Sequence, residues 1–303
     1  MTYIIFFFVS LALNYALRKL FIKKNIVDAI NHRSSHIVKA TRTGGLVLFT
    51  LLLAYTIFLY VQGIQPYDFS IIIPISILFI TGLYDDIYHV DFGLKFIFQI
   101  IAAKILIDLG YVIDIFSFFG IELEFSRIIS QVISIIFYVS IFNAYNFIDG
   151  IDLNIHLETI KNLILLLIIF NYKIEIEKLI LITGIIMITN ALFNYSKKLK
   201  VFMGDSGSLI IPLVLIIFVF EGIKINPDQN IIKYLMLIFV YPIFDLVRVV
   251  IIRLRNRNSP FIADKNHLHH FVEKKINNHF LSSITLTVLS AIIQCIVYLL
   301  IIN

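Results

Sequence analysis

The sequence predicts an all-α, polytopic integral membrane protein with about ten transmembrane helices, and its composition is the first reason. The 303 residues are 59% hydrophobic and only 15% charged, whereas a soluble domain contains about 45–50% apolar and about 25% charged residues. The mean hydropathy of +0.93 would leave a soluble fold with a largely apolar surface. A soluble globular fold, a disordered chain and a disulfide scaffold are therefore excluded, the last by the presence of a single cysteine.

Continuous apolar runs recur along the whole chain, and they are the second reason. A helix needs about 20 mainly apolar residues to cross a hydrocarbon core about 30 Å thick. The runs do not alternate as the strands of a membrane β-barrel do. The first run continues into basic residues without a small-residue cleavage site, so it is interpreted as a span and not as a signal peptide. The ten predicted spans lie near residues 3–17, 44–62, 69–84, 94–110, 127–143, 160–171, 178–194, 208–222, 231–248 and 282–302.

Lysine and arginine are distributed unevenly among the loops that join these spans. The loops that follow odd-numbered spans, together with the span ends that adjoin them, contain 19 of the 25 basic residues, and these loops also contain all eight histidines. Because basic loops remain in the cytoplasm, these loops are predicted to be cytoplasmic and both termini external. The net charge of +5 is explained in this way without a nucleic-acid partner.

Five polar clusters interrupt the apolar pattern, and each follows an odd-numbered span. Five clusters on one side of the membrane predict a single site built from cytoplasmic loops. The clusters are Asp28, Asn31, Arg33, Ser34, Ser35, His36, Arg42, Gly44 and Gly45; Asp85, Asp86, Lys95 and Gln99; Asn143, Asn146, Asp149, Gly150 and Asp152; residues 202–208; and Arg248, Arg253, Arg255, Arg257, Asp264, His267, His269 and His270.

The adjacent carboxylates of Asp85 and Asp86 repel each other. They favour a bound cation or a raised pKa in one of them, although a solvated helix end is an alternative interpretation. Lys95 lies a few residues later and could pair with these aspartates or with a phosphate.

The third and fourth clusters offer oxygen ligands and a phosphate-binding turn. Asn143 and Asn146 are three residues apart and share a helix face; with Asp149 they could bind Mg²⁺ or a nucleoside, or form a polar helix cap. In the segment 204–208, two glycines let backbone N–H groups approach a phosphate, and Asp205 is a natural Mg²⁺ ligand. A flexible serine-glycine turn is the alternative for this segment.

The histidine cluster fits phosphate better than zinc. His267, His269 and His270 have no cysteine partner nearby. With the arginines upstream, they are interpreted as donors to phosphate oxygens. These arginines are themselves typical of positive charge retained in the cytoplasm, and Asp245 is expected to pair with Arg248 or another interior group.

These motifs together resemble those of the polyprenyl-phosphate N-acetylhexosamine-1-phosphate transferases, the superfamily that includes the muramoyl-pentapeptide translocase and the eukaryotic dolichyl-phosphate enzyme. The matches occur in family order over most of the chain. The first and last are similar to the bacterial branch that starts O-antigen, common-antigen or teichoic-type polymers. The matching segments are 33–36 (Arg-Ser-Ser-His), 82–86 (Gly-Leu-Tyr-Asp-Asp), 143–152, 202–208 (Phe-Met-Gly-Asp-Ser-Gly-Ser) and 267–270 (His-Leu-His-His).

The resemblance implies transfer of a sugar-1-phosphate from a UDP-N-acetylhexosamine to undecaprenyl phosphate in the bacterial cytoplasmic membrane, with release of UMP. It implies one membrane transferase domain over residues 1–303, Mg²⁺ as cofactor with Mn²⁺ as a possible substitute, and membrane lipid as a partner, and it allows a homodimer. Direct attack by the lipid phosphate is favoured over a covalent aspartyl intermediate, because a phosphate is already anionic near neutral pH and needs only positioning and charge neutralisation.

The resemblance also implies three sets of site residues. In the family, positions matching Asn146 and Asp205 bind the metal, and the position matching Asp152 contacts the nucleoside. The expected catalytic residues are Asp85, Asp86, Asp149, His267, His269 and His270. The expected substrate-binding residues are Arg33, Ser35, His36, Arg42, Lys95, Asn143, Asp152, Gly204, Ser206 and Ser208.

Two departures from the family pattern concern the donor side. Leu153 and Asn154 follow Asp152 where the family usually has Gly-Leu, and the first loop lacks the usual prolines. Two other classes of protein compete with the transferase. A transporter would place ionisable residues at mid-membrane in repeated halves, and an intramembrane aspartyl protease would place paired aspartates inside spans; the polar residues here lie at span ends.

Overall fold

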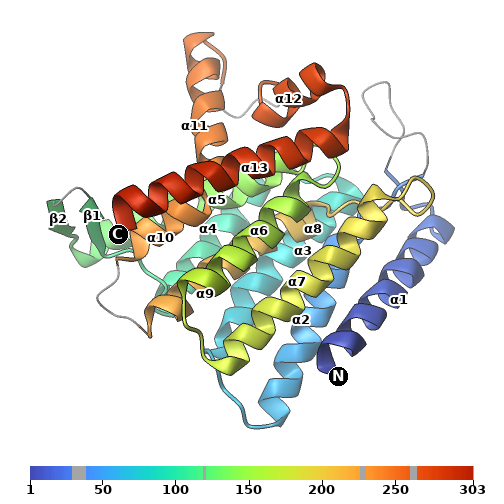
Figure 1. Cartoon of the computed structure of the whole chain (residues 1–303), viewed down its shortest axis with the longest axis horizontal. Coiled ribbons are helices and arrows are strands. Elements are labelled where there is room, and N and C mark those ends of the chain that lie inside the picture. Colours follow the sequence, from blue (N-terminus) through green and yellow to red (C-terminus); the bar gives the residue numbers. More distant parts are fainter. Residues whose placement is uncertain (29–38, 119–120, 226–229, 260–264, 303) are drawn as a thin grey trace.

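Helices occur at all ten predicted spans in the computed structural model, which describes residues 1–28, 39–118, 121–225, 230–259 and 265–302. They pack side by side in one bundle (Figure 1). The helices are α1 (Thr2–Lys23), α2 (Gly44–Val61), α3 (Ile72–Tyr88, preceded by the 3-10 turn η1, Phe69–Ile71), α4 (Phe92–Asp108), α5 (Arg127–Ile148), α6 (Asn154–Ile169), α7 (Ile174–Tyr195), α8 (Asp205–Ser208), α9 (Ile210–Ile223), α10 (Ile231–Ile238), α11 (Val240–Arg255), α12 (Leu268–Ile276) and α13 (His279–Val297, extended by the π-helical turn η2, Tyr298–Ile302).

Seven of the described segments are long and apolar enough to cross a membrane, or eight if the bent pair α10–α11 forms one span. The protein is therefore a multi-pass membrane protein. The predicted number of about ten is an upper figure, because α4 and α6 have only 17 and 16 residues, fewer than the roughly 20 that span the hydrocarbon core.

The ninth predicted span is not one helix. Its two halves, α10 and α11, meet at an angle of 76°. Pro242 lies in the first turn of α11 and has no N–H with which to bond the carbonyl of Ile238, four residues earlier, so the helix cannot continue through this point. As a result α11 leaves the bundle and projects from it together with α12 (Figure 1).

The helices alternate in direction, and their polar ends meet at one end of the bundle. Arg18, near the end of α1, donates a hydrogen bond of 2.9 Å to the carbonyl of Lys198, beyond α7. Lys95 at the start of α4 contacts Asp205 at the start of α8. Asp152 before α6 pairs with Lys200 at 2.5 Å. We call this end of the bundle the site end.

The segment α8–α9 lies at the centre of the bundle. In the apolar part of Asp205–Ile223, 94% of the residues are buried, against 17% in Thr2–Lys23 and 22% in His279–Leu300. Of the seven long segments, α1 and α13 are therefore the least buried, with most of their apolar side chains available to lipid. The segment that begins at Asp205 is enclosed by its neighbours, so its position is fixed by packing.

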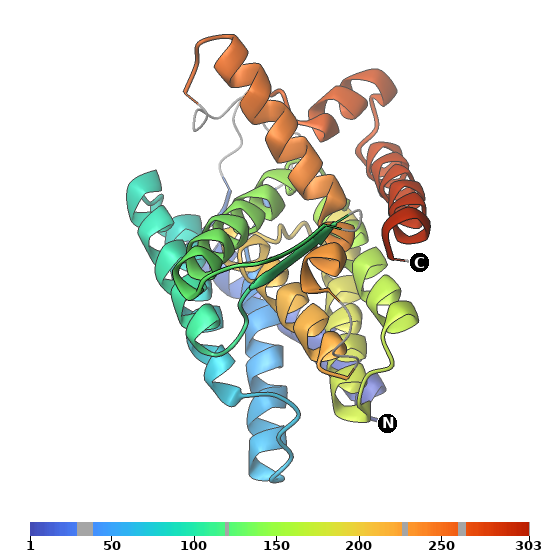
Figure 2. The same cartoon turned by 90° about the vertical axis from the view of Figure 1, so that its left-hand side faces the viewer.

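A short β-hairpin joins α4 to α5, and the sequence did not predict it. Strands β1 (Ile115–Phe118) and β2 (Ile121–Glu124) are antiparallel, with Ile115 opposite Glu124. The hairpin lies on the outside of the bundle, where β1 contacts α10 (Figure 2). It belongs to the end opposite the site end, because α4 begins at the site end and runs away from it.

Candidate active site

Asp86 holds the start of α8 in place. Its Oδ1 accepts a hydrogen bond from the backbone N–H of Asp205 (2.9 Å), and its Oδ2 accepts one from that of Ser206 (3.0 Å). The side chain is 1% exposed. The first N–H groups of a helix have no partner within the helix, so this buried carboxylate supplies the missing acceptors and joins α3 to α8.

Two glycines allow this close approach. A Cβ on Gly82 would overlap the backbone carbonyl of Asp205. Gly204 has a φ of +72°, a region that side chains disfavour, and a Cβ there would overlap the carboxylate of Asp86. Both glycines belong to the motifs singled out from the sequence, and the structure shows that α3 and α8 could not meet without them.

Basic side chains from two other elements surround these aspartates. Lys95 contacts the carboxylate of Asp205, and its Nζ lies 3.6 Å from Oδ2 of Asp85. Arg42 pairs with Asp28 at 2.7 Å and lies 3.7 Å from Oδ1 of Asp86. Burial alone would lower the pKa of Arg42, but the carboxylates of Asp28, Asp86 and Asp205 outweigh it and raise that pKa.

Negative charge remains in excess at this point. Asp149 ends α5 beside the same cluster, and burial, together with the carboxylates of Asp205 and Asp86, raises its pKa well above the usual range. The attraction of Arg42 does not compensate for these effects. A site with this balance of charges favours an added cation or a proton on Asp149.

The two asparagines of α5 point to different surroundings. Asn146 Nδ2 donates to Ser208 Oγ at 2.8 Å, so Asn146 lies beside the Gly204–Ser208 segment as the sequence predicts. Asn143 instead forms an amide pair with Gln99 of α4, in which Asn143 Nδ2 donates to Gln99 Oε1 at 2.7 Å. It also donates to the carbonyl of Val139. The structure therefore places Asn143 in a buried contact between α4 and α5.

Three side chains that are not among the predicted site residues hold Asp152. Lys200 Nζ lies 2.5 Å from Asp152 Oδ2, and His279 Nδ1 lies 3.7 Å from the same oxygen. Ser283 donates to the Asp152 carbonyl at 2.6 Å. Burial would raise the pKa of Asp152, but the His279 and Lys200 side chains beside its carboxylate outweigh it and lower that pKa below the usual range.

The departure from the family pattern at Leu153 has a structural counterpart. Leu153 adopts a φ of +68°, which favours glycine, the residue usual at this position in the family. Its N–H donates to Asn194 Oδ1 at 2.8 Å. The turn after Asp152 thus has a left-handed backbone at a residue that is not glycine.

The histidine segment packs against the end of α5. His267 Nδ1 lies 2.8 Å from Asp245 Oδ2, and Asp245 also accepts from Arg248, the pairing that the sequence predicts. His269 is 1% exposed and packs so closely on Gly150 that a Cβ there would overlap its ring. Burial, with His270 and His267 nearby, lowers the pKa of His269 to about 3.

A neutral His269 carries no net charge and can donate one hydrogen bond. Neither of its ring nitrogens has a hydrogen-bond partner among the described residues. Burial likewise lowers the pKa of His270, its neighbour. Both side chains therefore suit hydrogen bonding to a ligand better than ion pairing.

Arg33, Ser35 and His36 lie outside the described residues. The described end of the first loop packs against the glycine-rich segment. Phe202 N–H donates to the carbonyl of Thr41 at 2.8 Å, and Gly44 N–H donates to the carbonyl of Phe202 at 3.0 Å. The first and fourth polar clusters are thereby joined by backbone hydrogen bonds.

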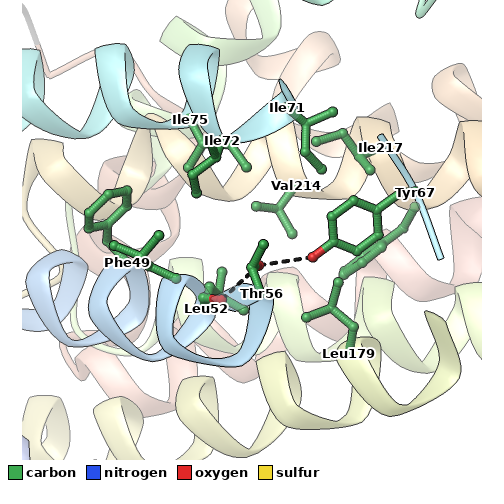
Figure 3. A pocket seen from close by; sticks show the side chains of 12 residues that line it. Phe49, Leu52, Thr56, Tyr67, Ile71, Ile72, Ile75, Leu179, Val214 and Ile217 are labelled. Carbon is green, nitrogen blue, oxygen red and sulfur yellow. Dashed lines mark hydrogen bonds between the residues drawn. The ribbon is translucent and has the colours of Figure 1, made fainter. Parts of the chain in front are cut away.

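A separate cavity lies among α2, α3, α7 and α9 (Figure 3). Its volume is about 30 Å³ and its lining is apolar except for Thr56 and Tyr67, whose hydroxyls bond each other at 2.9 Å. Thr56 lies 12 residues beyond Gly44 along α2, or roughly 18 Å from the site end at 1.5 Å per residue. The cavity is too small for a nucleotide and is not part of the site.

Comparison with known proteins gives relatives that share most of the chain. A probable undecaprenyl-phosphate N-acetylglucosaminyl 1-phosphate transferase of Bacillus subtilis (strain 168) is 28% identical over 259 residues, which are 84% of this chain and 71% of the relative. An undecaprenyl-phosphate alpha-N-acetylglucosaminyl 1-phosphate transferase of Thermotoga maritima is 27% identical over 258 residues, covering 84% and 75%. A decaprenyl-phosphate N-acetylglucosaminephosphotransferase of Mycolicibacterium smegmatis is 28% identical over 293 residues, covering 84% and 70%.

The family comparison identifies the region that contains most of the site. Residues 68–223 match glycosyl transferase family 4. This region includes Asp85, Asp86, Asn146 and Asp205, whose contacts build the centre of the site. Since the match covers more than half of the 303 residues, the chain belongs to glycosyl transferase family 4.

Proposed function

We propose that this protein transfers an N-acetylhexosamine-1-phosphate from a UDP-sugar to undecaprenyl phosphate, releases UMP and thereby begins a cell-surface polysaccharide. The observation that carries the proposal is the junction of α3, α4 and α8, where Asp86 holds Asp205 beside Lys95. The names of the relatives support the acceptor and make N-acetylglucosamine the first donor to test. The product would serve an O-antigen, a common antigen or a teichoic-type polymer.

The reaction needs one bond to form and one to break. An oxygen of the lipid phosphate attacks the sugar-bearing phosphorus of the donor, and the bond from this phosphorus to the bridging oxygen breaks, which leaves UMP. The attacking phosphate is already anionic, so the protein needs no nucleophile of its own. Lys95 and Arg42, the basic side chains beside Asp85 and Asp86, would offset the negative charge of the two phosphates. His269, neutral and buried, can donate a hydrogen bond to a phosphate oxygen.

Asp205 and Asn146 would hold Mg²⁺, with Mn²⁺ as an alternative. Carboxylate and amide oxygens are the donors that such hard cations prefer, and the excess of carboxylates around Asp205 fits a cation. Within the described residues, no group of three or more His, Cys, Asp or Glu side chains is placed to hold a metal ion. This suits Mg²⁺, which usually takes one or two protein carboxylates and otherwise water and substrate phosphates. When bound, the cation would neutralise charge on the diphosphate.

The exposed face of α11 suits the lipid chain. Phe244, Val247, Ile251 and Leu254 are 44–58% exposed. Their spacing places them on one face of the helix. The same helix holds Asp245, which bonds His267 beside the end of α5. A polyprenyl chain lying on this face would bring its phosphate toward the site.

We further propose that the site end faces the cytoplasm of the bacterial inner membrane. Most of the basic residues belong to loops at this end, and basic loops are retained on the cytoplasmic side.

The test is UMP release by the purified protein with undecaprenyl phosphate, Mg²⁺ and a panel of UDP-sugars, with and without EDTA. Release that requires both lipid and metal is expected, with UDP-N-acetylglucosamine as a donor. Asp205→Asn should abolish release, while Asp68→Asn, an exposed aspartate at the opposite end of the bundle, should not. Undiminished release by Asp205→Asn would refute the metal site, and no release with any UDP-sugar would refute the reaction.

A further inference from the structure

Helix α13 lies outside the region that matches the family, yet its first two turns hold Asp152. The backbone N–H of Asp152 donates to His279 Nδ1 at 3.3 Å. Ser283 Oγ donates to the backbone carbonyl of Asp152 at 2.6 Å. Nδ1 can accept this bond only when it carries no proton, which leaves Nε2, 3.9 Å from Glu273, as the nitrogen that would carry the proton.

Lys200 supplies the third constraint on Asp152. Its Nζ lies 2.5 Å from Asp152 Oδ2, and the lysine side chain is only 8% exposed. Its ammonium also lies 5.6 Å from the centre of the Phe202 ring, next to the glycine-rich segment. The contacts of the carboxylate with described residues use Oδ2, which leaves Oδ1 as the oxygen that can accept a hydrogen bond from a ligand.

The position of α13 is itself fixed by a polar stripe. His279, Ser283, Ser290 and Gln294 recur at intervals of four and seven residues, so they share one face of the helix. Ser290 accepts from Lys161 Nζ at 2.5 Å, and Gln294 donates to Asn162 Oδ1 at 2.9 Å. Both partners belong to α6, the helix that begins two residues after Asp152. Helix α13 is thus bound along α6, and its first turns are held over Asp152.

We infer that His279 and Ser283 are positioning residues that hold Asp152 to receive the nucleotide portion of the donor, and that the C-terminal helix thereby sets the affinity for UDP-sugars. This inference rests on the proposed function. The physical reason is preorganisation: without its two backbone anchors, Asp152 must be ordered each time the donor binds, which weakens binding by roughly 3- to 10-fold per anchor. The chemistry at phosphorus lies elsewhere, around Asp205, so turnover at saturation should not change.

The chain offers a matched control for Ser283. Ser282 is the adjacent residue, is also fully buried, and donates its hydroxyl to the Asn278 carbonyl within the same turn. Ser283→Ala and His279→Ala are expected to raise the KM for the UDP-sugar roughly 3- to 10-fold while leaving kcat and the KM for the lipid unchanged. Ser282→Ala should match the unchanged protein. His279→Asn, whose amide can accept the same N–H, should recover most of the affinity.

The affinity of each purified variant for UDP, measured by titration calorimetry, separates this inference from the proposed function. Weaker UDP binding by Ser283→Ala but not by Ser282→Ala supports the inference even if no sugar-phosphate transfer is detected. Equal KM and equal UDP affinity in all variants would overturn it, as would an equal loss in Ser282→Ala. Absence of both turnover and UDP binding in the unchanged protein would overturn both. If His279→Ala does not fold, Ser283→Ala, which removes a single hydroxyl, decides the question.

Discussion

Asp86 shows at the scale of one residue how a motif carboxylate can hold another element of the site in place. Both of its oxygens accept backbone N–H groups at the start of α8. Asp86→Asn leaves one acceptor and turns an N–H₂ group toward the other N–H, and a buried hydrogen bond to a charged group contributes about 1.5–3 kcal/mol. We expect a lower midpoint of thermal unfolding by circular dichroism. We also expect UMP release to fall about 100-fold, the typical cost of a small displacement in an active site.

Asp91 provides the comparison for Asp86. It caps α4 through one hydrogen bond of 2.9 Å from Gly93 and is exposed. Because asparagine is as good a cap as aspartate at an exposed helix start, Asp91→Asn should leave both unfolding and UMP release nearly unchanged. An Asp86→Asn protein as stable and as active as Asp91→Asn would refute the positioning role of Asp86.

Asp149 should make stability depend on pH in a particular direction. Burial and the carboxylates of Asp205 and Asp86 raise its pKa in the folded protein. A group with a raised folded pKa contributes stability that is fully present below its unfolded pKa and is lost as pH rises through the folded pKa. In EDTA, Asp149→Asn should therefore unfold at the same temperature as the unchanged protein near about pH 4. It should be increasingly more stable toward about pH 8. A difference in unfolding temperature that is constant across this range would contradict the prediction.

At the scale of an element, α6 contains a buried ion pair on the side where it meets α13. Lys161 Nζ lies 2.8 Å from Glu158 Oε1, and the Glu158 side chain is 0% exposed. Lys161→Ala leaves this carboxylate buried without its counter-charge, which costs about 3–5 kcal/mol. We expect a large fall in the midpoint of thermal unfolding of the purified protein, measured by circular dichroism.

The pair Glu175–Lys178 of α7 is the matched control, with the same spacing of three residues and a distance of 3.1 Å. Its side chains are 23% and 40% exposed, and exposed pairs contribute about 0–1 kcal/mol. Lys178→Ala should therefore unfold close to the unchanged protein. Equal effects of the two substitutions would show that burial does not determine the contribution of the Glu158–Lys161 pair.

The elements that the sequence predicts well are those with a continuous apolar pattern. All ten runs are helical, because a long apolar run in a membrane protein can satisfy its backbone only as a helix or a closed barrel. The bend between α10 and α11 was missed because Pro242 lies inside an apolar run. Hydropathy reports the polarity of side chains and does not reveal that a backbone N–H is missing. The hairpin β1–β2 was missed because strands of four residues are too short to show the alternation of apolar and polar residues that predicts a strand.

The residues of the candidate site that could be named from the sequence are those that occur in contiguous motifs. Asp86 and Asp205 could be named from the sequence, but the hydrogen bond that joins them links positions 119 residues apart. The contact between Asp152 and His279 spans 127 residues, and no periodicity signals a pairing of that kind. The same limit explains Asn143, whose spacing from Asn146 suggested a shared ligand, whereas Gln99 of a neighbouring helix takes its amide.

At the scale of the whole molecule, the distribution of charge predicts the orientation in the membrane. Cys295 is the single cysteine, so Cys295→Ala gives a background without thiols. In that background, Lys197→Cys marks the site end and Gln62→Cys the opposite end, both at exposed positions. Because basic loops stay in the cytoplasm, a membrane-impermeant maleimide added to intact bacterial cells should label Gln62→Cys and not Lys197→Cys. After permeabilisation both should be labelled to the same extent, which controls for reactivity. Labelling of Lys197→Cys in intact cells would place the site outside the cytoplasm and contradict the proposed use of a cytoplasmic UDP-sugar.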